Sequence, residues 1–235
     1  MKRIISLYQY LLSDTVKAVC VFYGILLLLI VFIGTMPSLA SGHMSGLEFA
    51  TTIFLFVVGL SSFKSGFLFA SASGFTRRQY VLAVAGMLAT VATFMSLVSM
   101  GITAAISMAM PIFTPWPQVY PQNTVAELGM WYWVINLWAA AMGLVITLAF
   151  YRLSTMGKWL LALSPVFLGI LLPILDGLAG NGLFRWFGTV FEALMGIGPR
   201  PIPLLGAGSI FLFALLLFAL ARLLVRGVPI KEQDQ

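Results

Sequence analysis

Long apolar runs alternate with short polar connections along the whole chain. Each run approaches the roughly 20 residues that an α-helix needs to cross the hydrocarbon of a bilayer. The pattern predicts six transmembrane helices, at residues 18–34, 49–70, 80–103, 128–151, 159–175 and 201–221, followed by a tail at 222–235. We therefore expect an all-α polytopic membrane protein in which residues 1–235 form a single transmembrane domain.

Basic residues gather in alternate connections and predict the orientation of the spans. The basic segments contain Lys2, Arg3 and Lys17, then Lys64, Arg77 and Arg78, then Arg152 and Lys158, and finally Arg222, Arg226 and Lys231. The other three connections hold only Arg185 and Arg200. Cytoplasmic loops carry an excess of Lys and Arg, so both termini are expected in the cytoplasm. Glu48, Glu127, Asp176 and Glu192 then lie on the outer side.

Composition supports a membrane protein and excludes several other classes. Apolar residues make up 61% of the chain and charged residues 9%, against about 25% charged in a typical soluble domain. The net charge of +6 is then expected to face anionic lipid or an acidic partner, and nucleic-acid binding is not expected. Cys20 is the only cysteine, which excludes a disulfide framework or a CxxC metal site.

A cleavable signal peptide is an alternative for the first span. Ser38-Leu39-Ala40 before Ser41 has the small-x-small form of a cleavage site. The long lead-in that contains Asp14, and a span long enough to remain in the membrane, favour a retained helix.

Residues 1–17 are expected to form an amphipathic interfacial helix. Polar residues recur at spacings of three and four, and an apolar face lies opposite them. Such a helix lies in the headgroup plane, and the chain then turns into the first span. It serves either as an anchor or as a lever between a cytoplasmic partner and the bundle.

The connection between the second and third spans has the pattern of a tight hairpin. Gly74 permits a turn, Thr76 can cap the next helix, and Arg77 and Arg78 offer forked donors for carboxylates. Phe75 is a candidate plug for a partner's pocket. The alternative is an ordinary positive-inside loop with an interfacial aromatic residue.

A second amphipathic helix is expected on the outer side, between the fifth and sixth spans. Its polar face includes Arg185, Thr189 and Glu192, and aromatic and aliphatic residues form the other face. Gly198, Pro199, Pro201 and Pro203 then break it before the last span becomes regular. This helix is either a lid over the bundle or an outer gate.

Polar residues within the spans are few. The third span carries a hydroxyl stripe and the fourth a single amide, namely Thr93, Ser96, Ser99, Thr103, Ser107 and Asn136. They suit helix packing, a dimer contact or a pathway lining. Because no ionisable residue is expected deep in a span, coupling to an ion gradient is disfavoured. His43, the only histidine, is expected in an outer loop, so no metal site, cofactor site or catalytic residue is predicted.

These features together resemble the membrane subunit of type-2 ABC exporters. At motif level the resemblance covers Gly74-Phe75-Thr76-Arg77-Arg78-Gln79-Tyr80, which is similar to the Gly-x-Ser/Thr-basic-basic-x-aromatic signature of small bacterial permeases in that family. The resemblance implies that residues 74–80 are a coupling helix that docks on a separate ATPase. The loops here are shorter than in larger family members, so a large outer substrate-recruiting domain is not expected.

The resemblance implies a non-enzymatic transport subunit in the bacterial cytoplasmic membrane. Two copies, or one copy and a related permease chain, would pair through spans 1, 2 and 5 over a cytoplasmic ATPase dimer that binds ATP and Mg²⁺. A hydrophobic or amphipathic substrate such as a lipid, lipopeptide or peptide would leave outward. An ion-coupled secondary transporter and a sensory or structural membrane protein are the alternatives.

Overall fold

The computed structural model describes residues 2–35, 47–108, 116–121, 124–178, 180, 182–198 and 200–226. These residues form α1 (Lys2–Thr35), α3 (Leu47–Ser61), α4 (Lys64–Ala72), α5 (Arg77–Ser107), α6 (Trp116–Val119), α7 (Val125–Arg152), α8 (Thr155–Leu178), α9 (Leu183–Met195) and α10 (Pro203–Arg226). Within the described ranges, six helical stretches are long and apolar enough to cross a membrane, with α3 and α4 counted together. The predicted all-α class and the six span-length helices are confirmed, which indicates a multi-pass membrane protein.

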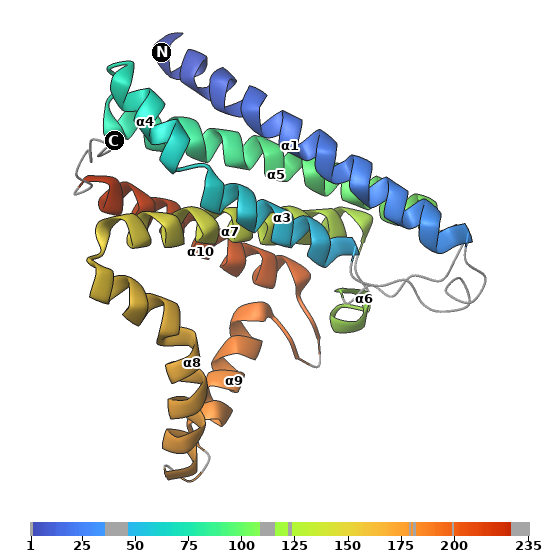
Figure 1. The fold of residues 1–235 in the computed structure, drawn as a ribbon. Helices are drawn as coiled ribbons and strands as arrows, with labels where there is room; N and C mark the ends of the chain where they lie inside the picture. Colours follow the sequence, from blue (N-terminus) through green and yellow to red (C-terminus); the bar gives the residue numbers. More distant parts are fainter. Residues whose placement is uncertain are drawn as a thin grey trace.

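A bundle of α1, α3, α4, α5, α7 and α10 forms the body of the molecule (Figure 1). The central helix is α7, which packs against α3, α5 and α10, while α1 lies along α5. The first helical turns of α1, the helix α4 and the end of α10 lie at one end of the bundle, and α6 lies at the other (Figure 1). These two ends are called the hairpin end and the α6 end below.

The contact between α3 and α7 is a close approach of two backbones. A methyl group on Gly59 would lie 2.1 Å from the carbonyl oxygen of Ala140, and one on Gly143 would lie 2.1 Å from that of Phe56. Only residues without a side chain allow this approach, which is the usual way in which small residues bring membrane helices together. Thr147 Oγ1 adds a hydrogen bond of 2.8 Å to the carbonyl oxygen of Leu60.

The N-terminal segment differs from the prediction. α1 runs as one helix from Lys2 to Thr35, so the turn expected between residues 17 and 18 is wrong. No proline occurs in this range and its first glycine is Gly24, so nothing local interrupts the helix. Leu7 and Leu11 are buried in the main core, which ties the first turns of α1 to the bundle.

The second span is broken rather than continuous. α3 ends at Ser61 and α4 begins at Lys64, with Ser62 and Phe63 in a turn between them. The buried Tyr80 hydroxyl donates to the carbonyl oxygen of Ser62 at 2.9 Å, and that of Phe63 lies 3.3 Å away. A break within a span is tolerated where neighbouring groups satisfy the backbone, and Tyr80 provides that here.

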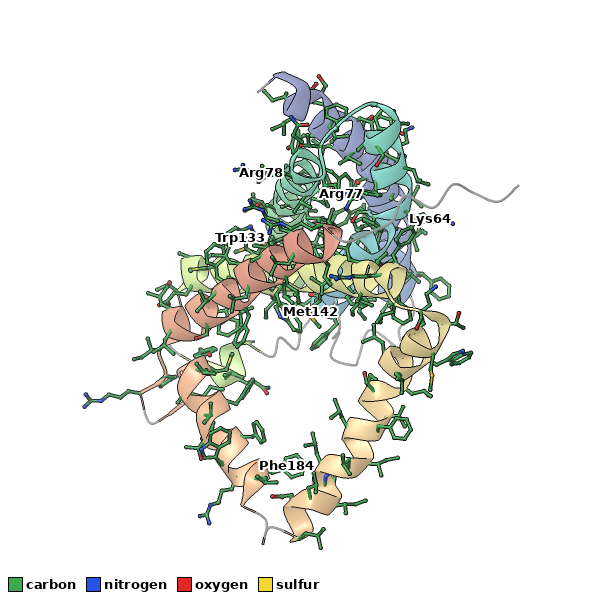
Figure 2. The ribbon with its side chains drawn as sticks, turned by 90° about the vertical axis from the view of Figure 1, so that its left-hand side faces the viewer. Lys64, Arg77, Arg78, Trp133, Met142 and Phe184 are labelled. Atoms are coloured by element: carbon green, nitrogen blue, oxygen red, sulfur yellow. The ribbon has the colours of Figure 1, made fainter. Side chains whose placement is uncertain are left out.

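The fifth span diverges from the bundle. α8 and α9 together form an arm that leaves the end of α7 and returns to the start of α10 (Figures 1 and 2). Leu153, between α7 and α8, has extended backbone angles, and Asp176 is the only buried side chain of α8. The apolar surface of α8 is thus left for lipid or for another chain to cover.

Candidate functional site

A cavity of about 760 Å³ lies toward the α6 end, where α3, α7, α9 and α10 converge. Most of its lining is aromatic or aliphatic. The lining residues are Glu48, Phe49 and Thr52; Val119 and Tyr120; Trp131, Tyr132, Ile135 and Trp138; Phe191, Leu194, Met195 and Ile197; and Ile210 and Phe213. The volume is within the range of about 300–1,000 Å³ that is typical of pockets for small molecules.

Glu48 is the only charged residue that lines this cavity among the residues that the structure describes. It lies in the first turn of α3 and is 9% exposed. The hydroxyl of Tyr132, on α7, donates to its Oε1. Sequence reasoning placed Glu48 only on the outer side, so its burial in a cavity is a feature that the sequence analysis missed.

Thr52, one turn further along α3, joins the cavity to a polar network inside the bundle. Its hydroxyl donates to Asn136 Oδ1 at 2.9 Å, and Asn136 Nδ2 donates to Ser96 Oγ at 2.8 Å. A second link pairs the hydroxyls of Thr51 and Ser99 at 2.9 Å. These bonds connect α3, α5 and α7, as expected for hydroxyl and amide groups between membrane helices.

The hydroxyl residues predicted as a stripe on the third span differ in their burial. Ser96 and Ser99 are buried, Thr103 is half-buried, and Thr93 and Ser107 are exposed. Thr93 accepts a hydrogen bond of 2.8 Å from Trp133 Nε1 on α7. Ser96, Ser99 and Asn136 thus contribute to packing within one chain, and a role in a dimer contact or a pathway stays a prediction.

Side-chain hydrogen bonds to backbone carbonyls tie the end of α9 to Tyr120, just after α6, and tie α7 to the start of α10. Tyr120 donates to the carbonyl oxygen of Met195 at 2.5 Å, and Trp131 Nε1 donates to that of Pro203 at 3.0 Å. Burial raises the pKa of Tyr120, so its hydroxyl stays protonated and remains a donor. Gly206 lies in this corner, where a methyl group would be 2.5 Å from the carbonyl oxygen of Met195.

The amphipathic helix predicted between the fifth and sixth spans is present as α9, and its place on the outer side stays a prediction. The side chains of its predicted polar face, Arg185, Thr189 and Glu192, are exposed. Phe191, Leu194 and Met195 line the cavity, and Figure 2 shows Phe184 on the side of α9 toward α8. Asp176 of α8 caps the start of α9, because its Oδ1 accepts from the amides of Leu183 at 2.7 Å and Phe184 at 3.1 Å.

The hairpin at residues 74–80 has the predicted turn and cap. Gly74 has a positive φ of 71°, which is strained for other residues. Thr76 caps α5 by accepting from the amide of Gln79, and the Gln79 side chain accepts from the amide of Thr76 at 2.9 Å. This reciprocal capping box gives the hairpin one defined shape.

The two arginines of the hairpin differ in their surroundings. Arg77 donates to the carbonyl oxygens of Val225 at 3.3 Å and of Arg226, so it binds the end of α10. Arg78 is exposed, and Figure 2 shows it extending away from the bundle. Phe75 is half-buried and packs against the main core, and Tyr80 is buried beneath the hairpin. Arg78 is therefore the better placed of the two arginines for contact with a partner.

His43 and the Ser38-Leu39-Ala40 sequence lie outside the described residues, as does Lys231. Among the residues that are described, no group of three or more His, Cys, Asp or Glu side chains is arranged to hold a metal ion.

Comparison with protein-family models, with curated proteins and with solved structures finds no match to this chain.

Proposed function

We propose that this protein is the membrane permease subunit of a type-2 ABC exporter, which moves a hydrophobic or amphipathic substrate outward with ATP hydrolysed by a separate chain. The observation that carries the proposal is the placement of the apolar cavity and the capped hairpin toward opposite ends of one bundle. An exporter needs a docking point for its ATPase on one side and a chamber for an apolar substrate toward the other. On this proposal the protein lies in the bacterial cytoplasmic membrane, and both of its termini face the cytoplasm.

A single helix, α10, connects the cavity with the hairpin and offers a route for coupling between them. α10 contributes Ile210 and Phe213 to the cavity, and its end is bound by Arg77 of the hairpin. A displacement of the hairpin by an ATPase would pull on the end of α10. Because a helix is stiff along its axis, the same displacement would reach the wall of the cavity.

A second permease copy is part of the proposal, through the resemblance stated above. The exposed apolar surface of α8, the fifth span, is consistent with a partner chain there. Lipid alone would also cover such a surface, so the observation supports pairing without requiring it.

Purification of the tagged chain from the membranes of its source bacterium tests the proposal. We expect a second chain to co-purify that lacks membrane spans and hydrolyses ATP. The measurement is ATP hydrolysis by the eluate together with mass spectrometry of its components. Recovery of the intact chain without any ATP-hydrolysing partner, under several mild detergents, would count against the proposal.

An ion-coupled transporter is the second candidate, and Glu48 is the observation that favours it. Buried carboxylates in membrane proteins often hold a coupling ion or proton. The purified chain in ATP-free liposomes separates the candidates, with dodecyltrimethylammonium as the probe. Flux of the probe under an imposed proton or sodium gradient would support this candidate and contradict the exporter.

A further inference from the structure

The cavity is open near the middle of two span-length helices. Trp138 lies near the middle of α7 and Phe213 near the middle of α10. Both side chains line the cavity, and they are 38% and 47% exposed. Because both helices are long and apolar enough to cross a membrane, their middle parts are expected at the depth of the lipid hydrocarbon. The open side of the cavity then faces lipid chains and not water.

Away from this open side, the wall of the cavity is closed by buried side chains. Tyr120, Trp131 and Met195 line the cavity and are buried. Tyr120 directly follows α6, so the closed part lies toward the α6 end. The cavity is thus a recess that a flexible apolar molecule can enter from the side of the bundle.

The polar groups of the lining already have partners within the protein. The hydroxyl groups of Thr52, Tyr120 and Tyr132 each donate a hydrogen bond to a protein acceptor. Glu48, the charged residue of the described lining, is the acceptor for Tyr132. Trp138 carries a further donor, but it lies at the open side. A polar head group inside the recess would therefore lose water without gaining matched partners, which costs free energy.

We propose that the cavity takes up one acyl chain of a bilayer lipid, which enters past Trp138 and Phe213 while the head group of the lipid stays outside. Lipid chains are as apolar as this lining, so a chain can exchange between bilayer and cavity without the cost that a head group would meet. The proposal rests on the proposed function and names the exporter's substrate class. The substrate is a molecule with such a chain, received from the bilayer and recognised by its chain.

Photo-crosslinking of the full chain in phosphatidylcholine nanodiscs tests this proposal. One lipid probe carries a diazirine near the end of an acyl chain, and a second carries it in the head group. We expect the chain probe alone to label the buried residues Trp131 and Met195, as located by mass spectrometry of the digested protein. Phe167, which is exposed on α8, shows that the chain probe reacts.

Two results would overturn the proposal. One is labelling by the chain probe that reaches Phe167 but neither Trp131 nor Met195, and the other is equal labelling of these two residues by the head-group probe. Either result leaves the co-purification of an ATPase untouched, so this failure and that of the proposed function are distinguishable.

A matched pair of variants on α10 assigns the labelling to the cavity. Ile210→Trp adds bulk to the lining and is expected to abolish the label on Met195. Leu212→Trp adds similar bulk at an exposed position outside the lining and is expected to keep that label. An unchanged label in Ile210→Trp would overturn the assignment. If that variant fails to fold, the comparison of the two probes on the unmodified chain still decides whether a chain enters.

Discussion

Replacing Gly143 with alanine is expected to lower the free energy of unfolding by about 3 kcal/mol or more, at the upper end of the range for overpacked cores. The added methyl group would lie 2.1 Å from the carbonyl oxygen of Phe56 and 2.8 Å from the amide nitrogen of Leu60. Both are backbone atoms, so no side-chain rotation relieves the clash, and α3 must move away from α7. Thermal unfolding of the purified protein measures the effect, with a midpoint lower by about 6 °C or more.

Gly24→Ala is the matched control for this prediction. Gly24 lies within α1, and a methyl group there meets no atom within 4 Å. Alanine is about 1 kcal/mol more favourable than glycine inside a helix, so the midpoint should stay the same or rise. Gly59→Ala, on the facing helix, should resemble Gly143→Ala. Indistinguishable midpoints for Gly24→Ala and Gly143→Ala would refute the close contact between α3 and α7.

On the proposed function, Arg78 contacts an acidic surface of the ATPase, and Arg78→Glu is then expected to lower the amount of co-purified ATPase at least about tenfold, because like charges placed opposite each other across an interface cost several kcal/mol. Arg78 is exposed, so the thermal midpoint of the chain alone should change little. Arg77→Gln, in contrast, is expected to change the thermal midpoint of the chain alone, because Arg77 holds the end of α10. The measurement is ATP hydrolysis per amount of tagged chain in the eluate.

Arg185→Glu is the control for the change in charge. Arg185 is also exposed but lies on α9, away from the hairpin. It should retain the ATPase fully. Full retention by Arg78→Glu would exclude Arg78 from the docking surface, and equal loss in both variants would show a general effect of charge instead.

Local chemistry explains which parts of the fold the sequence could predict. The spans follow from the length of their apolar runs, and the turn at Gly74 and the cap at Thr76 depend on residues within five positions. The break between α3 and α4 was not predicted, since it depends on Tyr80, 18 residues beyond Ser62. The expected turn near residue 17 was an error of interpretation, because the sequence there contains no helix breaker.

The candidate site was only partly predictable for the same reason. The apolar side of α9 was visible in the sequence, but the cavity depends on contacts between distant residues: Tyr120, just after α6, bonds the end of α9, and Trp131 of α7 bonds the start of α10. Glu48 and Tyr132 are 84 residues apart, so their contact follows only from the packing of α3 on α7. One signal was available in the sequence. Glu48 and Tyr132 lie near the first residues of the second and fourth apolar runs, and these two ends are expected on the same side of the membrane.

The most direct test of the proposed ATP-driven export uses inside-out membrane vesicles from cells that produce this chain, in which export appears as uptake. The probe is dodecyltrimethylammonium, whose charge does not depend on pH. We predict accumulation of the probe that requires ATP, persists when the proton gradient is dissipated, and is absent from vesicles that lack this chain. Accumulation driven by an ion gradient without ATP, or ATP-dependent accumulation that is equal without the chain, would contradict the account.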